Sequence, residues 1–354
     1  MWRLNQETYK KLVSGQSKGI AAAAARAVLR LISWGYAAII GIRNLLYSAG
    51  LMKIHRINIP VISVGNITAG GTGKTPLVIW LCSQIKNQKS KIKNCCILTR
   101  GYKTPDEPKI LEQSCPAAKI IINPDRVAGA QEAINKYNAK VLIMDDGFQH
   151  RRLARNLDIV AIDATCPFGH GKILPAGLLR EPLSSLKRTN AVVITRSDQI
   201  KTSELENLEV RLRRINPNTI IAKAVHNPIC VKTAKGEQIP IDQFKSKKVF
   251  AFCGIGNPDA FFSTIRTACT QLAGSRTYND HHIYTSEDIN DIYEEANYLG
   301  VSVVLTTQKD WIKISAMKLP ATAIIFGYLE VEIKFTEGED KLKQLIDTAL
   351  TGKI

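Results

Sequence analysis

The residues with the clearest capacity for chemistry are those at 68–75, which read TAGGTGKT. They follow a β-branched run at 59–64 that predicts a strand, and they precede an apolar stretch with helical spacing at 77–85. A glycine-rich turn between a strand and a helix aims backbone N–H groups and the positive end of the helix dipole at one point. We therefore expect a phosphate-binding loop for a nucleoside triphosphate.

Two side chains in this loop have the types that triphosphate chemistry needs. Lys74 is placed to reach the β- and γ-phosphates, and the Thr75 hydroxyl is placed to bind Mg²⁺. The strict pattern begins with Gly, whereas this chain has Thr68 there. A glycine-rich turn with an incidental Gly-Lys-Thr is the alternative interpretation, which the strand–loop–helix context disfavours. The residues predicted to contact the nucleotide are Thr68, Ala69, Gly70, Gly71, Thr72, Gly73, Lys74 and Thr75.

The elements around the loop predict an α/β fold of the P-loop NTPase type. Apolar strands alternate with helices, which indicates a mostly parallel sheet covered on both faces. Asp145 and Asp146 directly follow a strand, at the sheet edge where a Mg²⁺-holding carboxylate belongs. Turn or helix-cap chemistry is the alternative for such a pair. The expected strands are 96–99, 119–122, 140–144, 159–162 and 191–195, with a helix at 126–137.

A second, smaller α/β domain is expected in the C-terminal part of the chain. Two segments, 226–241 and 328–335, are predicted to form a β-ribbon that joins it to the nucleotide core. The predicted domains are an amphipathic membrane-interface segment (1–50), the kinase core (51–225) and the smaller domain (226–354). Its expected elements are strands 248–253, 303–306 and 322–325 and helices 260–269, 287–298 and 341–350.

Composition limits the class of partner. The 354 residues include 48 Lys and Arg against 31 Asp and Glu, a formal charge of +17. This excess favours anionic partners such as phosphorylated substrates or acidic lipid. Few aromatic residues accompany the basic ones and no nucleic-acid motif is present, so nucleic acid is disfavoured. The eight cysteines show no CxxC spacing and are expected to be buried thiols of a reducing compartment.

The apolar segment at 19–46 predicts a helix at a membrane surface. Its longest uncharged stretch, 31–42, is shorter than the ~20 residues that span a bilayer. Trp34 and Tyr36 are residue types favoured at the headgroup level, and basic residues flank or interrupt the segment. We expect the helix to lie in the interface of an anionic membrane. A soluble helix packed on the protein's own core is the alternative.

A membrane-associated GTPase or ATPase switch is the alternative to an enzyme. The residues after the strand at 191–195, Arg196-Ser197-Asp198, weakly resemble a guanine-reading pattern, but Arg replaces its Lys. In Thr307-Gln308-Lys309-Asp310 the Lys comes one place too late.

Six ordered blocks, which cover nearly the whole chain, resemble the tetraacyldisaccharide 4'-kinase (lipid A 4'-kinase) family of Gram-negative bacteria. The resemblance implies a kinase that uses ATP and Mg²⁺ to phosphorylate the 4'-hydroxyl of a tetraacylated glucosamine disaccharide 1-phosphate, the lipid A precursor. It also implies a monotopic protein, expected as a monomer, on the cytoplasmic face of the inner membrane. The blocks are VGNITAGGTGKTP (64–76), DDGFQHRRLARNLDIVAID (145–163), GHGKILPAGLLREP (169–182), CGIGNPDAFF (253–262), NDHHIYT (279–285) and TTQKD (306–310).

The resemblance also implies roles for individual residues. Asp106 matches the family's proposed base, and His281 matches the histidine that orients it. Lys74 matches the phosphate-loop lysine. The residues implied near Mg²⁺ are Thr75, Asp145, Asp146, Glu107 and Glu181, with His150 and Arg180 close by.

The sequence departs from the family pattern at several positions in these blocks. Lys103 and Pro105 replace glycines, the loop before Asp106 is short, and Gln308 stands where Glu is usual. Because His281 lies far from Asp106 in the chain, we expect the two to face each other across an interdomain cleft that closes during catalysis.

Overall fold

A computed structural model describes residues 6–87, 94–101, 106–269, 271–317, 319–320 and 323–352. The departures from the family pattern at Lys103 and Pro105 lie outside these residues. The chain forms two compact units. The first unit comprises Met1–Tyr102, Leu111–Val225 and Phe335–Ile354, and the second comprises Lys103–Ile110 and His226–Lys334.

The first unit is built on a parallel sheet whose strands are buried on both faces. Every pair of neighbours in it is parallel, which confirms the predicted α/β class with a mostly parallel sheet. Its strands lie in the order β3 (Ala118–Ile122), β2 (Cys95–Thr99), β4 (Val141–Asp145), β1 (Val61–Asn66), β5 (Leu157–Asp163), β6 (Ala191–Thr195) and β7 (Ile220–Thr233).

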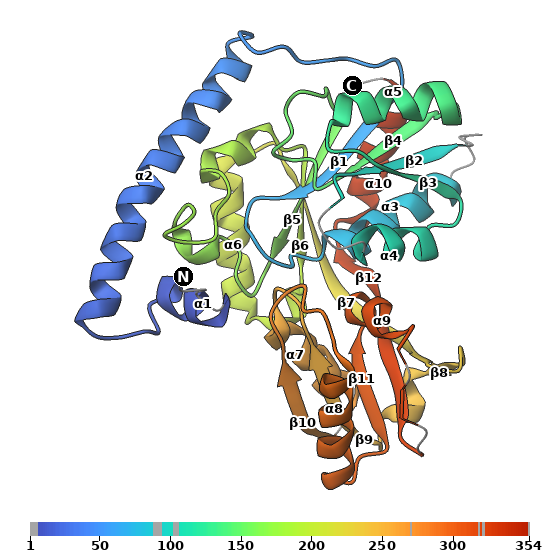
Figure 1. The fold of residues 1–354 in the computed structure, drawn as a ribbon. Helices are drawn as coiled ribbons and strands as arrows, with labels where there is room; N and C mark the ends of the chain where they lie inside the picture. Colours follow the sequence, from blue (N-terminus) through green and yellow to red (C-terminus); the bar gives the residue numbers. More distant parts are fainter. Residues whose placement is uncertain are drawn as a thin grey trace. The chain divides into compact units, whose positions relative to one another are not determined.

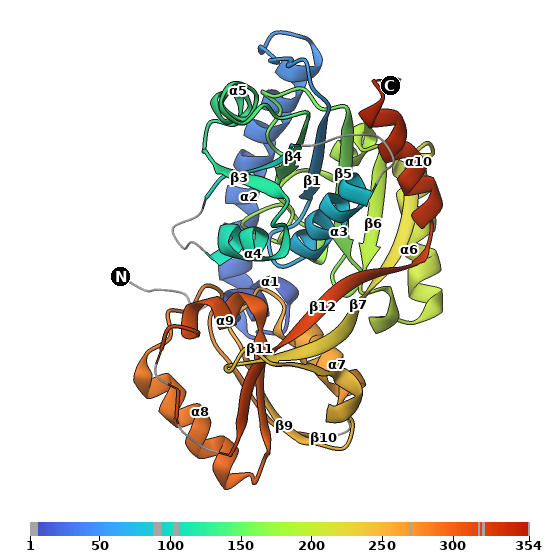
Figure 2. The same cartoon turned by 90° about the vertical axis from the view of Figure 1, so that its right-hand side faces the viewer.

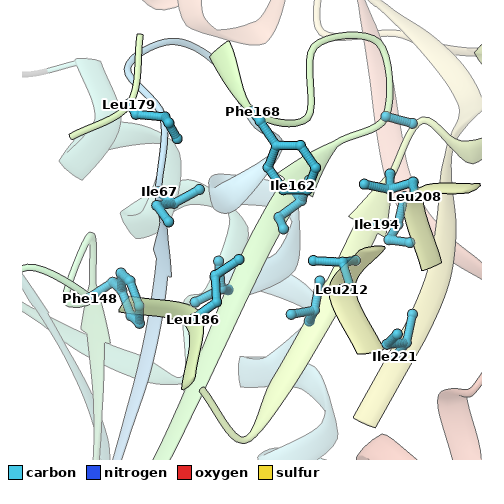
Figure 3. Close-up of a cluster of buried hydrophobic side chains, with 13 residues drawn as sticks. Ile67, Phe148, Ile162, Phe168, Leu179, Leu186, Ile194, Leu208, Leu212 and Ile221 are labelled. Atoms are coloured by element: carbon cyan, nitrogen blue, oxygen red, sulfur yellow. The ribbon is translucent and has the colours of Figure 1, made fainter. Parts of the chain in front are cut away.

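Helices cover both faces of this sheet. α3 (Lys74–Asn87) packs on β1 and β4 on one face, as Figure 2 shows. α5 (Arg126–Tyr137) covers the other face, and the Asp125 side chain caps its first turn by accepting the N–H groups of Val127 and Ala128. α6 (Thr202–Ile215) packs against residues of β5 and β6. Leu208 and Leu212 of α6 join the apolar cluster drawn in Figure 3.

The N-terminal segment forms α1 (Gln6–Ser14) and one continuous helix, α2 (Ile20–Ser48), which Figure 1 shows unbroken. Ser33, Ile40 and Tyr47 are its buried residues, and their seven-residue spacing places them on one face. By length and composition α2 is able to cross a membrane. The helix is longer than the uncharged stretch 31–42 because it continues through Arg26, Arg30 and Arg43.

The second unit has its own parallel strands, in the order β10 (Gln271–Thr277), β9 (Lys248–Cys253), β11 (Val303–Thr307) and β12 (Ile325–Glu337). The short β8 (Gln238–Pro240) pairs antiparallel with the end of β7. The chain passes between the units along β7 and β12. The helices are α7 (Pro258–Ala268), α8 (Ser286–Tyr298) and α9 (Gln308–Ile314). Two aromatic–aliphatic clusters, one on each side of β9, form its core.

The structure differs from the sequence-based predictions in several places. α10 (Glu339–Leu350) belongs to the first unit, although residues 226–354 are predicted as one domain. β12 begins at Ile325, so residues 323 and 324 of the predicted strand 322–325 precede it. Elements that the sequence analysis does not predict include β10, α6, α9 and α4 (Asp106–Ser114), together with the short 3₁₀ helices η1 (Gly169–Gly171), η2 (Leu183–Arg188), η3 (Ser197–Gln199) and η4 (Ile241–Phe244).

The end of β1 has no room for a side chain at Gly65. A Cβ there would lie 2.7 Å from the backbone nitrogen and 2.5 Å from the Cβ of Phe148, a fully buried residue. We expect Gly65→Ala to lower the free energy of unfolding by roughly 1–3 kcal/mol, the usual cost of overpacking. Gly35→Ala is the matched control, because no atom lies within 4 Å of a Cβ at Gly35. Equal urea midpoints for the two variants would contradict this expectation.

Candidate active site

The phosphate-binding loop has the backbone geometry that its sequence predicts. Gly70 and Gly73 adopt φ values of 115° and 79°, which side chains disfavour, and α3 begins at Lys74. The loop is also anchored on one side, because the Ala69 N–H donates to the carbonyl oxygen of Leu178 at 2.7 Å. The first turn of a 14-residue helix therefore presents free backbone N–H groups beside a turn, the arrangement that binds phosphate.

Buried polar side chains hold the middle of this loop. The Asn66 amide donates to the Thr72 hydroxyl at 3.0 Å, and the Thr195 hydroxyl donates to the Thr72 carbonyl at 3.0 Å. Arg196 donates to the Gly71 carbonyl at 3.0 Å and forms a buried ion pair with Asp163. In the sequence, Arg196 stands out only because Arg196-Ser197-Asp198 weakly resembles a guanine-recognition motif. Its contacts are instead those of a residue that supports the loop.

Lys74 lies in a chain of charges at the end of β4. Its Nζ is 3.5 Å from Asp146 Oδ1, and Arg180 Nη1 donates to both oxygens of the same carboxylate, at 3.1 and 2.9 Å. Burial alone would raise the pKa of Asp146, but the two cations hold that pKa well below its ordinary value. Asp146 itself adopts φ 51°, a left-handed conformation that is rare outside glycine. The structure thus brings together three of the predicted site residues.

Two of the oxygen ligands predicted for Mg²⁺, Thr75 and Asp145, lie at the ends of elements of the first unit. Thr75 lies in the first turn of α3, and Asp145 is the last residue of β4, buried and within 3.4 Å of the Thr99 hydroxyl. Hydroxyl and carboxylate oxygens are the donor types that Mg²⁺ prefers, and this ion usually shares them with substrate phosphates. In the described ranges, no group of three or more His, Cys, Asp or Glu side chains that could hold a metal ion is found.

His150 follows the acidic pair Asp145 and Asp146 in the sequence. Burial, followed by the cations of Arg126 and Arg152, lowers the pKa of His150 to about 4, so its imidazole is neutral at neutral pH. Its Nε2 is buried and has no hydrogen-bond partner among the described residues. The neighbouring Arg126 is buried and donates to the Asp145 carbonyl at 3.0 Å, a support that the sequence analysis missed.

Glu181 is held by donors from α2 and by Arg188. Its side chain is fully buried, and its two oxygens accept hydrogen bonds from Arg43 at 2.9 Å and from Asn44 at 3.0 Å. Arg188 forms an ion pair with it at 3.0 Å. The assignment of Glu181 to Mg²⁺ stays a prediction from the family resemblance. This residue is adjacent to Arg180 in sequence, but its carboxylate ties α2 to the body of the first unit.

Asp106 and His281 lie close together within the second unit. His281 Nδ1 is 3.6 Å from Asp106 Oδ2, a distance typical of a catalytic pair before it tightens around substrate. Asp106 is only 3% exposed, and its Oδ2 has no hydrogen-bond partner among the described residues. His281 adopts φ 62°, a strained conformation for a residue with a side chain. The two residues belong to one unit, so the prediction that they face each other across two domains was wrong.

Two lysines of α9, one helical turn apart, surround this pair. Lys309 Nζ is 3.3 Å from His281 Nε2, 3.1 Å from Asp280 Oδ1 and 3.9 Å from Glu107 Oε1. Lys313 Nζ is 3.6 Å from Asp106 Oδ2 and 3.1 Å from Asp310 Oδ1. In the sequence, Lys309 belongs to the TTQKD block (306–310) but has no predicted role, and Lys313 is not among the predicted site residues. The available signal was their spacing of four residues after a buried strand.

Comparisons with known proteins identify the family of this chain. The family model described as tetraacyldisaccharide-1-P 4'-kinase matches residues 25–105 and 103–351. A tetraacyldisaccharide 4'-kinase from Halothermothrix orenii is 33% identical over 321 residues, which cover 81% of this chain and 83% of the relative. One from Desulfotalea psychrophila is 34% identical and covers 80% of this chain and 87% of its own length.

A solved structure is similar over almost the same extent. The crystal structure of LpxK from Aquifex aeolicus in complex with ATP is 29% identical, with a TM-score of 0.69, and the match covers 92% of this chain and 99% of that one. The matches span both units and include the phosphate loop, the acidic pair and the segment around His281. On these grounds the chain belongs to the tetraacyldisaccharide-1-P 4'-kinase family.

Proposed function

We propose that this protein transfers the γ-phosphate of ATP to the 4'-hydroxyl of a tetraacylated glucosamine disaccharide 1-phosphate in lipid A synthesis. Its family is one of kinases, and a similar protein has been solved with ATP. The observation that supports the proposal most is the buried carboxylate of Asp106, whose Oδ2 has His281 and Lys313 each at 3.6 Å and no hydrogen-bond partner among the described residues. A nucleotide switch has no need of such a base.

The phosphate loop supplies most of the charge neutralisation in this proposal. Backbone N–H groups of residues 70–75 bind the β- and γ-phosphates, and Lys74 exchanges part of its contact with Asp146 for a phosphate oxygen. Thr75 and Asp145 are the residues of the first unit that would hold Mg²⁺, and Asp146, Glu107 and Glu181 complete the predicted set. The ion, when bound, neutralises charge on the transferred phosphoryl group.

The sugar hydroxyl that receives the phosphoryl group needs a base to take its proton more than it needs to become a stronger nucleophile. Phosphoryl transfer passes through a loose transition state, so alignment matters more than activation of the sugar hydroxyl. Asp106 accepts the hydroxyl proton as the bond to phosphorus forms, and His281 keeps its carboxylate oriented. This assignment uses the unsatisfied oxygen of Asp106 and the left-handed backbone that directs His281.

We also propose that α2 lies at the interface of an anionic membrane, on its cytoplasmic side. Its polar side chains hold one face to the first unit: the Ser33 hydroxyl donates to Ile173 O at 2.8 Å and the Tyr36 hydroxyl to Arg180 O at 3.2 Å. A helix that crosses a membrane is surrounded by lipid, whereas one face of α2 is bonded to the rest of the first unit. These contacts therefore favour a helix that lies on the membrane surface with its other face in the lipid. Its large exposed apolar residues are Ile20, Val28, Leu31, Ile32, Trp34, Ile39, Ile42 and Leu45.

Charged substitutions on the exposed face of α2 test this placement. Leu31→Glu with Ile39→Glu is expected to lower binding to vesicles of anionic phospholipid by at least about tenfold, because two apolar side chains no longer enter the interface. Val210→Glu, on the exposed side of α6, is the matched control. Co-sedimentation measures both variants, and unchanged binding of the α2 variant would refute the membrane role.

The proposed reaction is tested by its product. Incubation with ATP, Mg²⁺ and the disaccharide 1-phosphate in mixed micelles should yield a lipid with a second phosphomonoester, visible by ³¹P NMR. Release of inorganic phosphate with no new lipid resonance would favour the ATPase switch. Competition between ATP and GTP for binding separates the remaining alternative, because a guanine-reading switch prefers GTP.

A further inference from the structure

His281 has a donor on the side of its ring that faces away from Asp106. Lys309 Nζ lies 3.3 Å from His281 Nε2 and within 3.1 Å of Asp280 Oδ1, while Nδ1 faces Asp106. Lys309 is thus shared between a carboxylate and the imidazole, and its side chain is 18% exposed. The ring therefore lies between a cation and the candidate base.

This arrangement determines which ring nitrogen carries the proton. A lysine ammonium only donates hydrogen bonds, so its partner Nε2 must present a lone pair. The competing acceptor, Asp280 Oδ1, is 3.9 Å from Nε2, which is beyond hydrogen-bond distance. A neutral imidazole with a lone pair on Nε2 carries its proton on Nδ1, the nitrogen that faces the Asp106 carboxylate.

We infer that Lys309 is a positioning residue that selects the Nδ1–H tautomer of His281 and so lets this histidine donate to Asp106. The inference rests on the proposed roles of Asp106 and His281. With the other tautomer, two lone pairs would face each other between His281 and Asp106, and the carboxylate would lose the donor that orients it toward the sugar hydroxyl.

Hydrogen bonds through Gly254 hold α9 and His281 in position for this contact. Asp310, which is next to Lys309, accepts the Gly254 N–H at 2.9 Å and the Thr307 hydroxyl at 2.8 Å. The carbonyl of the same Gly254 accepts the His281 N–H at 3.3 Å. One glycine therefore joins the helix that carries Lys309 to the strained residue that Lys309 contacts.

A double-mutant cycle tests the inference by activity. Lys309→Met should lower kcat by roughly tenfold to a hundredfold, a share of the 10²- to 10⁴-fold that a positioned base contributes, with little change in KM for ATP or lipid. In a His281→Ala background the same substitution should cost nothing further, because Lys309 acts through His281. Lys245→Met, an exposed lysine of the same unit that pairs with Asp242, is the matched control and should keep wild-type kcat.

The outcomes separate this inference from the proposed function. An equal further loss in the His281→Ala background would overturn the role of Lys309 and leave the role of His281 intact. Wild-type kcat for His281→Ala would overturn the proposed pair itself, and with it this inference.

A spectroscopic measurement on the wild-type protein needs no variant to be active. In protein labelled with ¹⁵N-histidine, the ring nitrogens of His281, assigned from the signals that vanish in His281→Ala, should show Nδ1 protonated and Nε2 bare. Lys309→Met should increase the Nε2–H form. A wild-type spectrum with Nε2 protonated would refute the inference even if Lys309→Met fails to fold.

Discussion

Asp106→Ala is expected to lower kcat by roughly 10²- to 10⁴-fold, the usual contribution of a positioned general base, while ATP affinity stays within about twofold. The large effect on kcat and the small effect on ATP affinity follow from the separate roles proposed for the two parts of the site. The phosphate loop binds the nucleotide and Asp106 only receives the acceptor proton. Steady-state kinetics with the lipid acceptor, together with ATP binding by calorimetry, measure the two quantities separately.

Two controls sharpen this prediction. Glu112→Ala changes an exposed carboxylate on the same helix, α4, and should leave kcat unchanged. Asp106→Asn keeps the shape and loses the basic oxygen, so it should be nearly as slow as Asp106→Ala. A large residual rate for Asp106→Asn would mean that Asp106 acts by geometry, and near-normal turnover of Asp106→Ala would remove it from the base role.

Lys74→Ala is expected to reduce phosphoryl transfer by roughly 10²- to 10³-fold or more, because it removes a cation from the developing negative charge. The variant should also fold, since Asp146 keeps its two hydrogen bonds from Arg180. The measurement is the rate of transfer at saturating ATP, with circular dichroism as the check on folding. Lys86→Ala, in the last turn of the same helix, is the matched control. A Lys74→Ala rate within about threefold of wild type would contradict a transition-state role for this cation.

The parts of the site that depend on short stretches of chain could be predicted from sequence. The strand before the loop at 68–75 and the helix after it are each specified by the residues within them. The positive φ values of Gly70 and Gly73 could therefore be expected from this short stretch of sequence alone. Asp145 and Asp146 follow from the rule that ligands gather at the carboxyl ends of parallel strands.

The parts that depend on packing between distant segments could not. Glu181 follows Arg180 in sequence, yet its carboxylate is directed to Arg43 of α2, a contact that spans 138 residues. Asp106 was expected to face the second unit, and it belongs to that unit, because Lys313 and His281 contact it there. Lys309 belongs to the TTQKD block (306–310), but its role follows only from the position of the His281 ring.

Transfer of labelled γ-phosphate from ATP to a disaccharide 1-phosphate in mixed micelles tests the central proposal most directly. The wild-type protein should give a labelled lipid product, as should the control variants Lys86→Ala and Glu112→Ala. Lys74→Ala and Asp106→Ala should give almost none. Wild-type protein that binds ATP and leaves the lipid unlabelled would contradict it.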